Sequence, residues 1–349
     1  MPWVRLLGAG KSGEKVSTRV YLDWNATAPL RPEARAAMIA ALEVVGNPSS
    51  VHAEGRAAKM LVERAREDLA ATVGCRPGEV VFTSGATEAA GVLSGFADVT
   101  VEPTAHDCLM AHAKGAGGVL ALGLANSETG ILSEMPARGG VLVDVVQAVG
   151  RVPFAFGWSG ADFAILSAHK LGGPKGVGAL IVREGIEIAP LRPGGGQETG
   201  RRSGTENIVG IAGFAAAATA ALRDLEDGVW EPVRGMRDRM EAVLSAEGAE
   251  VAGAGLARLP NTSCLMCTGW KGETQVMQMD LSGFAVSAGS ACSSGKVRRS
   301  RVLTAMGYDD LAAGSAIRVS LGPATEEEDV VRFAEVWAEA HRKFRARAA

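Results

Sequence analysis

The sequence has few cysteines, little net charge and no long apolar segment, and each shortage excludes a class of protein. Its five cysteines among 349 residues are odd in number and irregularly spaced, which argues against a disulfide framework and for reduced thiols. The 36 Lys+Arg nearly balance the 39 Asp+Glu, so the net charge of −3 argues against a strongly basic nucleic-acid-binding protein. Hydrophobic residues make up 47% and charged residues 21%, a composition that excludes a largely disordered chain.

The longest apolar run, Ile208–Leu222, is shorter than the roughly 18 residues that a membrane-spanning helix requires. Because this run is rich in Ala and Gly, we expect a packed interior helix and no association with a membrane. The N-terminal residues 1–17 lack the apolar core of a signal peptide. These features predict a cytoplasmic protein.

Glycine, by contrast, is abundant. The 45 glycines fall in short clusters without a collagen period, which indicates tight turns and loops that approach a ligand closely. Short β-branched runs alternate with longer Ala-rich stretches, a pattern typical of an α/β fold. The predicted strands are Val20–Leu22, Glu79–Thr83, Val141–Asp144, Asp162–Leu166, Val177–Val182, Thr262–Cys267 and Ile317–Leu321. The predicted helices are Pro32–Val44, Ala53–Thr72, Thr274–Leu281 and a terminal helix that opens with a capping box at Thr325–Glu328.

The composition changes after the Ala-rich run that ends at Leu222, and this change predicts two domains. We expect a large domain over residues 24–222. Residues 1–23 and 223–349 are expected to form a smaller α/β domain, which the N-terminal strand joins.

Two motifs resemble known binding sites but lack essential parts. Gly8–Ser12 is similar to the end of a nucleotide P-loop, yet Arg5 stands where the pattern requires glycine and no strand precedes it. Cys264 and Cys267 have the spacing of half a zinc site, but no second pair or suitable histidine follows. We therefore expect a flexible N-terminal segment and no metal site.

Three segments carry residues suited to one cofactor chemistry. An apolar strand ends in Ser167-Ala-His-Lys170, and a lysine at a strand end among small residues can form a Schiff base with an aldehyde. Ser84-Gly-Ala-Thr-Glu88 leaves a strand and opens a helix, where backbone N–H groups and a hydroxyl can bind phosphate. Asp144 ends a buried strand, and a buried carboxylate requires a cationic partner such as a protonated pyridine nitrogen.

Together these residues resemble the pyridoxal 5'-phosphate enzymes of fold type I, specifically the class V aminotransferase superfamily and its cysteine desulfurase branch. The resemblance extends over most of the chain, from Tyr21 to about Glu328. Its further motifs are Asn47-Pro-Ser-Ser50, Asn126-Ser-Glu-Thr-Gly130, Asp144-Val-Val-Gln147, Arg202-Ser-Gly-Thr-Glu-Asn207, Ser287-Ala-Gly-Ser-Ala-Cys292 and Ile317-Arg-Val-Ser-Leu-Gly322. The resemblance implies an α/β fold in which a large domain holds a mixed, mostly parallel sheet.

The resemblance also implies a role for each matching residue. Lys170 would form the Schiff base and later move the proton of the substrate Cα. Asp144 would pair with the pyridine nitrogen, Gln147 would bond the phenolic oxygen, and His106 would stack on the ring and assist proton transfer. The residues expected around the phosphate are Gly85, Ala86, Thr87, Ser167, His169 and, reaching from the second subunit of a homodimer, Thr205. Asn126 and Arg318 would hold the substrate carboxylate.

Cys292 lies in a stretch of small residues, Ser287–Gly295, that has little to pack and is expected to be mobile. By the resemblance, its thiolate would attack the sulfur of L-cysteine, forming an enzyme persulfide and releasing L-alanine. A passive loop thiol is the alternative interpretation. The persulfide would supply iron–sulfur cluster assembly or another thiolation pathway through an acceptor or scaffold protein that the sequence does not identify.

The sequence departs from the family pattern in three places. The stretch between His106 and Asn126 is far shorter than usual, which predicts a reduced helix and strand in the large domain. Ala168 stands where glycine is frequent, and Gly91 where a polar residue is frequent. Neither substitution removes a catalytic group. The rival hypotheses are a selenocysteine lyase, another class V enzyme, and a non-catalytic binding partner with the same fold, against which the intact site residues argue.

Overall fold

The computed structural model describes residues 19–289 and 299–348. The P-loop-like residues Gly8–Ser12 and the predicted nucleophile Cys292 lie outside this part of the chain. Two compact units make up the fold. The first, called the larger unit, contains Thr27–Ser127 and Leu132–Gly228, and the second, called the smaller unit, contains the described residues of 1–26, 128–131 and 229–349.

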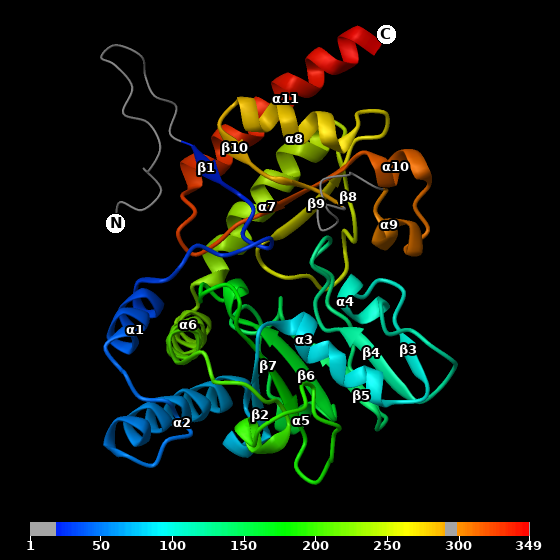
Figure 1. The fold of residues 1–349 in the computed structure, drawn as a ribbon. Coiled ribbons are helices and arrows are strands. Elements are labelled where there is room, and N and C mark those ends of the chain that lie inside the picture. Colours follow the sequence, from blue (N-terminus) through cyan, green and yellow to red (C-terminus); the bar gives the residue numbers. More distant parts are fainter. Residues whose placement is uncertain (1–18, 290–298, 349) are drawn as a thin grey trace, which may run out of the picture. The chain divides into compact units, whose positions relative to one another are not determined.

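A six-stranded sheet forms the centre of the larger unit (Figure 1). Its order is β2-β7-β6-β5-β4-β3. The strands are β2 (Val80–Thr83), β3 (Val99–Val101), β4 (Val119–Gly123), β5 (Val141–Asp144), β6 (Phe163–Ser167) and β7 (Gly178–Val182). Neighbours from β3 to β6 pair in parallel, whereas β7 is antiparallel to both β6 and β2, so β2 runs in the same direction as β6. The mixed, mostly parallel sheet expected for the large domain is confirmed.

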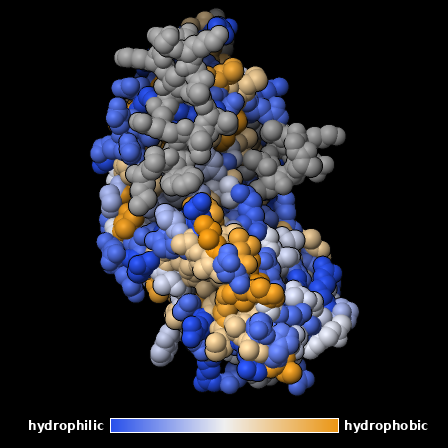
Figure 2. Space-filling model, turned by 60° about the vertical axis from the view of Figure 1, so that its left-hand side comes forward, coloured by the Kyte–Doolittle hydropathy of each residue, from blue (hydrophilic) through white to orange (hydrophobic). Residues whose placement is uncertain are grey.

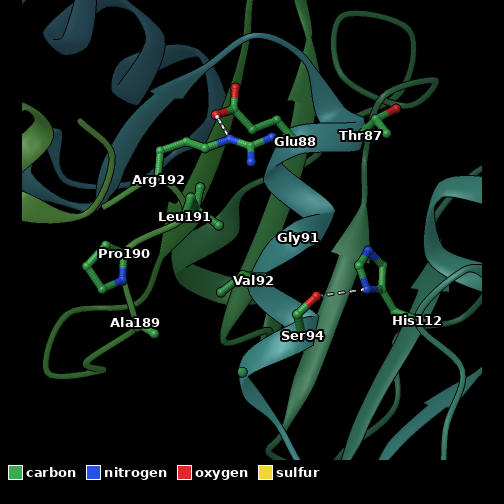
Figure 3. A pocket seen from close by; sticks show the side chains of 11 residues that line it. Thr87, Glu88, Gly91, Val92, Ser94, His112, Ala189, Pro190, Leu191 and Arg192 are labelled. Atoms are coloured by element: carbon green, nitrogen blue, oxygen red, sulfur yellow. Dashed lines mark hydrogen bonds and ion pairs between the residues drawn. The ribbon is translucent and has the colours of Figure 1, made fainter. Parts of the chain in front are cut away.

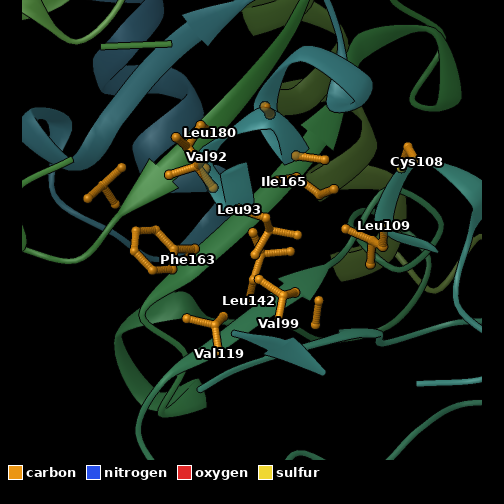
Figure 4. Close-up of a cluster of buried hydrophobic side chains, with 14 of the residues drawn as sticks. Val92, Leu93, Val99, Cys108, Leu109, Val119, Leu142, Phe163, Ile165 and Leu180 are labelled. Carbon is orange, nitrogen blue, oxygen red and sulfur yellow. The ribbon is translucent and has the colours of Figure 1, made fainter. Parts of the chain in front are cut away.

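The central strands β5, β6 and β7 form from short apolar runs, as expected for strands that are covered on both faces of the sheet. The structure confirms the predicted β5. The predicted β2 and β7 begin one residue too early, and the predicted β6 is shifted by one residue at both ends. Buried side chains of the strands β2 to β7 pack against three short helices in one hydrophobic cluster (Figure 4). These helices are α3 (Ala86–Ala90), η2 (Gly91–Gly95) and α4 (Asp107–Met110). Leu93, Leu109, Leu142 and Ile165 are fully buried in this cluster.

Two longer helices of the larger unit, α1 (Pro32–Leu42) and α2 (Ala53–Val73), each pack against a third, α6 (Ile208–Glu226) (Figure 1). Helix α2 ends at Gly74 in a left-handed conformation (φ 66°), which glycine adopts without steric cost. Among the described residues, α6 alone is long and apolar enough to cross a membrane. The face of α6 that is rich in Ala and Gly is buried, and the helix packs against α1 and α2, as expected for an interior helix.

The smaller unit contains a four-stranded antiparallel sheet in the order β11-β12-β9-β8 and a parallel pair of β1 and β10. These strands are β1 (Val20–Tyr21), β8 (Glu250–Val251), β9 (Thr262–Met266), β10 (Phe284–Ala285), β11 (Ser287–Ala288) and β12 (Ala316–Ser320). Its helices are α7 (Trp230–Ala246), α8 (Gly272–Leu281), α9 (Arg301–Ala305), α10 (Asp310–Gly314) and α11 (Glu327–Ala348). The N-terminal strand thus pairs within the smaller unit.

The remaining short elements connect the sheets to the helices: η1 (Pro77–Glu79), α5 (Phe156–Ser159), η3 (Ala168–Lys170) and η4 (Gln197–Gly200). The capping box predicted at Thr325 does not form as expected, because α11 begins at Glu327 and the Thr325 hydroxyl accepts the N–H of Gly322. The shortened stretch after His106 contains only the four-residue helix α4 and a bridge between Val99 and Lys114 before β4 begins.

Candidate active site

Strand direction brings the predicted site residues of the larger unit to one edge of its sheet. Strands β2 to β6 all run the same way, so their carboxyl ends meet at that edge, where α/β sheets bind ligands. The segments that follow these ends carry Ser84–Thr87 after β2, His106 after β3, Asn126 after β4, Asp144 and Gln147 at β5, and Ser167–Lys170 at β6. Five separate segments therefore supply groups to one place.

The turn after β2 is held tightly against its neighbours. Gly178 of β7 pairs with both Thr83 and Ser167, and a Cβ atom there would lie 2.6 Å from the Gly85 Cα and 2.5 Å from the Leu166 oxygen. Only glycine permits this approach. Within the turn, the Thr83 hydroxyl donates to the Gly85 oxygen at 3.0 Å. This hydrogen bond holds the backbone at the start of the predicted phosphate-binding segment Gly85–Thr87.

Glu88 stabilises the same turn from inside α3. Its carboxylate accepts the N–H of Ser84 at 2.6 Å and pairs with Arg202 at 3.2 Å. Burial alone would favour the neutral acid, but the hydrogen bonds from Arg202 and Ser84 outweigh it and lower the pKa of Glu88. The carboxylate is therefore ionised at neutral pH and links the turn to the segment that contains Thr205.

Asp144, at the end of β5, has a carboxyl whose pKa is shifted by its surroundings. Burial raises the pKa of its carboxyl, and the N–H of Val146 and the charges of His106 and Lys170 act in the opposite direction. The Val146 N–H donates to the Asp144 Oδ1 at 2.9 Å. A carboxyl group in this setting gains stability from any further cation placed beside it. His106 and Lys170, both predicted from the sequence as site residues, thus lie close enough to Asp144 to lower the pKa of its carboxyl against the effect of burial.

His106 is held in one tautomer by its own helix. It is the N-cap of α4, and its Nδ1 accepts the N–H of Cys108 at 3.1 Å. An imidazole nitrogen that accepts a hydrogen bond carries no proton, so in the neutral ring the proton is on Nε2. His106 therefore presents an N–H donor through Nε2, the form suited to exchange a proton with a bound ligand.

His169 is neutral at physiological pH. Burial, reinforced by the charges of Lys170 and Lys175, lowers its pKa to about 4. Its Nδ1 lies 3.2 Å from the Thr27 hydroxyl, and the sequence analysis did not identify Thr27 as a partner. A neutral His169 can contribute a hydrogen bond to a phosphate, and a bound dianion would favour its protonated form.

Two further predicted residues occupy less buried positions in the larger unit. Asn126 donates through Nδ2 to the Thr104 oxygen at 2.9 Å, which joins the segment after β4 to the segment after β3. Thr205 is exposed in the segment between η4 and α6. Its exposure is compatible with a role at a second subunit.

Arg318 belongs to β12 of the smaller unit and is almost completely buried. Its Nη2 donates to the Asp23 Oδ1 at 2.8 Å, and the other Asp23 oxygen accepts the Ser287 hydroxyl at 2.8 Å. A guanidinium has five N–H donors in a planar fork, so one ion pair does not by itself exclude a second carboxylate. Asp23 orients this fork, which the sequence analysis did not predict.

Three of the described thiols, those of Cys75, Cys264 and Cys267, are poor nucleophiles because burial favours their protonated form. Burial raises the pKa of Cys75 to about 12, and burial also raises the pKa values of Cys264 and Cys267. Cys267 has its sulfur 2.9 Å from the His341 Nε2 in an aromatic cluster of the smaller unit. Neither Cys264 nor Cys267 belongs to a group of three or more metal-ligating side chains within residues 19–289 and 299–348.

A pocket of about 440 Å³ lies on the outer face of α3 and η2 (Figure 3). Figure 3 shows the pair of Glu88 and Arg192 on one side and the hydrogen bond between Ser94 and His112 on the other. Thr87 is the one predicted site residue in its lining. His112 comes from the shortened stretch after His106, so this wall is built by residues in which the sequence departs from the family pattern.

Comparison with known proteins gives the family. The model of the family "Aminotransferase class-V" matches residues 20–107 and 116–333. The chain belongs to the aminotransferase class-V family. The resemblance derived from the motifs is thereby confirmed, and the interruption of the match at residues 108–115 falls within the shortened stretch.

Relatives of this family member include proteins named for one activity. A "Cysteine desulfurase" of Cereibacter sphaeroides is 40% identical, with 91% of this chain and 94% of the relative covered. A second "Cysteine desulfurase", from Frankia sp. (strain EuIK1), is 38% identical, with 92% and 91% covered. The solved structure of a "NifS-like protein" from Rickettsia africae ESF-5 superposes with a TM-score of 0.84 at 28% identity, covering 93% of this chain and 99% of that one.

Proposed function

We propose that this chain is a cysteine desulfurase that converts L-cysteine to L-alanine and transfers the sulfur to its own Cys292. The observation that carries the proposal is the convergence of Asp144, His106 and Lys170 at the carboxyl edge of the large sheet. A carboxylate, an imidazole donor and a primary amine together are the groups that an aldehyde-bearing pyridine cofactor requires. The relatives named cysteine desulfurase support the choice of reaction.

The residues at the sheet edge fit pyridoxal 5'-phosphate. Burial raises the pKa of the Asp144 carboxyl, and a protonated ring nitrogen beside it would stabilise the ionised form. The turn Ser84–Thr87 and the side chains of Ser167 and His169 offer hydrogen-bond donors for the phosphate. When bound, this cofactor supplies an electron sink for the charge left after the substrate loses its Cα proton.

Each residue then has a defined task. The Lys170 amine would hold the cofactor and would move the proton of the substrate Cα. Gln147 would donate to the phenolic oxygen, and His106 would offer its Nε2 proton to the bound cofactor. Asn126 and Arg318 bind the substrate carboxylate, for which the Arg318 fork has the matching geometry.

Cys292 carries out the sulfur transfer. Its thiolate forms a bond to the sulfur of L-cysteine as the C–S bond breaks, and the electron pair of that bond takes a proton at the former Cβ. The products are L-alanine and a Cys292 persulfide, so no external oxidant or reductant is required for this step. The free thiol has an ordinary pKa of about 8.5, and a thiolate is therefore a minority species at pH 7 unless a neighbouring group favours it.

We propose a homodimer in which Thr205 contacts the cofactor of the second subunit. Exposed apolar side chains in and beside α1 and α2 support such an interface, because isolated monomers seldom expose many large apolar residues together. Apolar surface gathers on one face of the molecule in Figure 2. The exposed large apolar residues in and beside α1 and α2 are Leu30, Ile39, Leu42, Val45, Val51 and Met60. Sedimentation equilibrium would show twice the mass of 36.0 kDa if the proposal is correct.

We further propose a large domain of residues 24–222 and a small domain of residues 1–23 and 223–349. We also propose a cytoplasmic location, and delivery of the persulfide sulfur to an acceptor or scaffold protein of iron–sulfur cluster assembly or another thiolation pathway. The reduced-thiol composition and the relatives' activity support these assignments.

The test is turnover of cysteine by the purified protein and its Cys292→Ser variant. With cysteine and a thiol reductant, the wild type should release alanine and sulfide in equal amounts. The variant should bind the cofactor, change its spectrum with cysteine, and form almost no persulfide or alanine, because a hydroxyl is a poor nucleophile toward sulfur. Near-normal desulfuration by the variant would refute the persulfide mechanism. Turnover of selenocysteine alone would identify a selenocysteine lyase instead.

A further inference from the structure

Arg151 is a buried arginine beside the candidate site that the proposed function does not yet use. It follows β5 and is 5% exposed, and Gln147 lies four residues earlier and is 4% exposed. Its Nη1 donates to the side-chain Oε1 and, at 3.4 Å, to the backbone oxygen of Gln147. Its Nη2 donates to the backbone oxygen of Lys170 at 3.2 Å.

These hydrogen bonds decide which way the Gln147 amide points. A guanidinium has only donors and remains charged at any physiological pH, so the atom that faces it must be the amide oxygen. The Gln147 amino group is therefore directed away from Arg151. A charged donor on the oxygen also polarises the amide and strengthens the N–H groups at its other end as donors.

We propose that Arg151 is a positioning residue that fixes Gln147 as a hydrogen-bond donor toward the phenolic oxygen of the cofactor and ties it to the Lys170 backbone. This inference rests on the proposed function. Without Arg151, the amide of Gln147 could rotate by half a turn and present its oxygen, which would repel a phenolate. One guanidinium thus sets the polarity of one cofactor contact and the position of the lysine that holds the cofactor.

The consequence is visible in the absorption spectrum of the holoenzyme. A hydrogen bond donated to the phenolic oxygen stabilises its anionic form and lowers the pH at which the bound cofactor loses its proton. Loss of the donor should raise that pH by about one unit, since hydrogen bonds to charged groups are among the stronger ones in proteins. A residue with a purely structural role would not move this spectroscopic pH.

The experiment compares the pH dependence of the visible band in reconstituted holoenzyme for the wild type and four variants. Gln147→Met removes the contact itself, and Arg151→Met should raise the transition pH by a similar amount. The double variant should match Gln147→Met alone, because both changes remove one interaction. Arg151→Lys, which can only donate, should restore a transition pH close to that of the wild type.

Two further variants control for folding. Arg183→Met removes another guanidinium of the larger unit that donates to backbone oxygens of Phe156 and Ala161, and its band should titrate as in the wild type. If Arg151→Met is insoluble, Arg151→Gln serves in its place. Glutamine can either donate or accept, so it no longer forces the orientation, and the transition pH should rise while the Lys variant stays near wild type.

The outcomes separate the inference from the proposed function. A shift for Gln147→Met without one for the Arg151 variants, an additive shift in the double variant, or a Lys variant as shifted as Met would overturn the role of Arg151 and leave the proposed function intact. Failure of the wild type to take up pyridoxal 5'-phosphate, or no shift for Gln147→Met, would overturn the proposed cofactor site and the role of Arg151 with it.

Discussion

Replacing Glu198 by alanine removes the anion from a buried ion pair in the larger unit. The Glu198 side chain is 2% exposed and that of Arg66 is 11% exposed. The two carboxylate oxygens accept from the Arg66 Nη1 and Nη2 at 2.8 and 2.9 Å, and one of them also accepts the N–H of Phe82 in β2 at 2.9 Å. We expect Glu198→Ala to destabilise the larger unit strongly.

The magnitude follows from what the substitution leaves behind. The Arg66 guanidinium and the Phe82 N–H would remain buried without this carboxylate, and breaking a buried pair from one side costs about 3–5 kcal/mol. Counting two lost bonds between charged groups at roughly 1.5–3 kcal/mol each gives a similar value. Glu198 and Thr199 also have left-handed backbone conformations (φ 48° and 55°), which non-glycine residues adopt only when their surroundings impose them.

The assay is urea unfolding followed by circular dichroism, with the cofactor content of each purified protein measured alongside. Glu247→Ala is the control, because it breaks the more exposed pair with Arg342 and should cost at most about 1 kcal/mol. Glu198→Ala should also retain less cofactor, since Glu198 anchors the segment that leads to Thr205. A loss of less than about 1 kcal/mol in Glu198→Ala would refute the view that this pair holds the segment in place.

Three other measurements test the site. Arg318→Lys should raise KM for cysteine more than it weakens cofactor binding, because an ammonium cannot bind a carboxylate with two parallel bonds; equal losses would argue against a substrate role. The pKa of His169 in the folded protein, about 4, lies below its ordinary value of 6.5, so the unfolded chain binds more protons between these two pH values. The free energy of unfolding should therefore fall as the pH falls through that range. His169→Asn should flatten this pH dependence in acid unfolding curves. Brief alkylation of the native protein at pH 8 should modify Cys292 well before Cys75 and Cys264, whose pKa values are raised by burial; peptide mass mapping showing early labelling of Cys264 would contradict the burial argument.

Strands and long helices could be predicted from the sequence because their signals are local. The β-branched run Val141–Asp144 is buried on both sides and can only be a central strand. Helix α1 begins at Pro32, where the missing N–H of proline costs nothing, although it ends two residues before the predicted Val44. The predicted capping box at Thr325 puts the first helical residue at Glu326, one residue before the observed start of α11 at Glu327, and the Thr325 hydroxyl instead accepts the N–H of Gly322.

The residues that support the site could not be predicted in the same way, because their roles depend on contacts between distant segments. Thr27 is separated from His169 by more than a hundred positions, and nothing in the local sequence links them. The same holds for Asp23 and Arg318, and for Arg66 and Glu198. Arg151 is the exception, since it lies only four residues from Gln147 in the chain, and the turns that follow β5 bring the two side chains together.

The direction of β7 explains why the turn Ser84–Thr87 and the segment Ser167–Lys170 lie close together at this edge of the sheet. A strand parallel to β2 and β6 would end at this edge, and the loop that follows it would also lie there. The antiparallel β7 instead begins at this edge with Gly178 and runs toward the opposite edge of the sheet. Because Gly178 has no side chain, the turn after β2 and the end of β6 approach each other across a single residue. A substitution Gly178→Ala should therefore separate Ser84–Thr87 from Ser167–Lys170, or force one of them to move, without adding any polar group. In the function proposed above, this close approach would matter as much as the reactive side chains, since a phosphate held at Ser84–Thr87 would fix the aldehyde that Lys170 must reach.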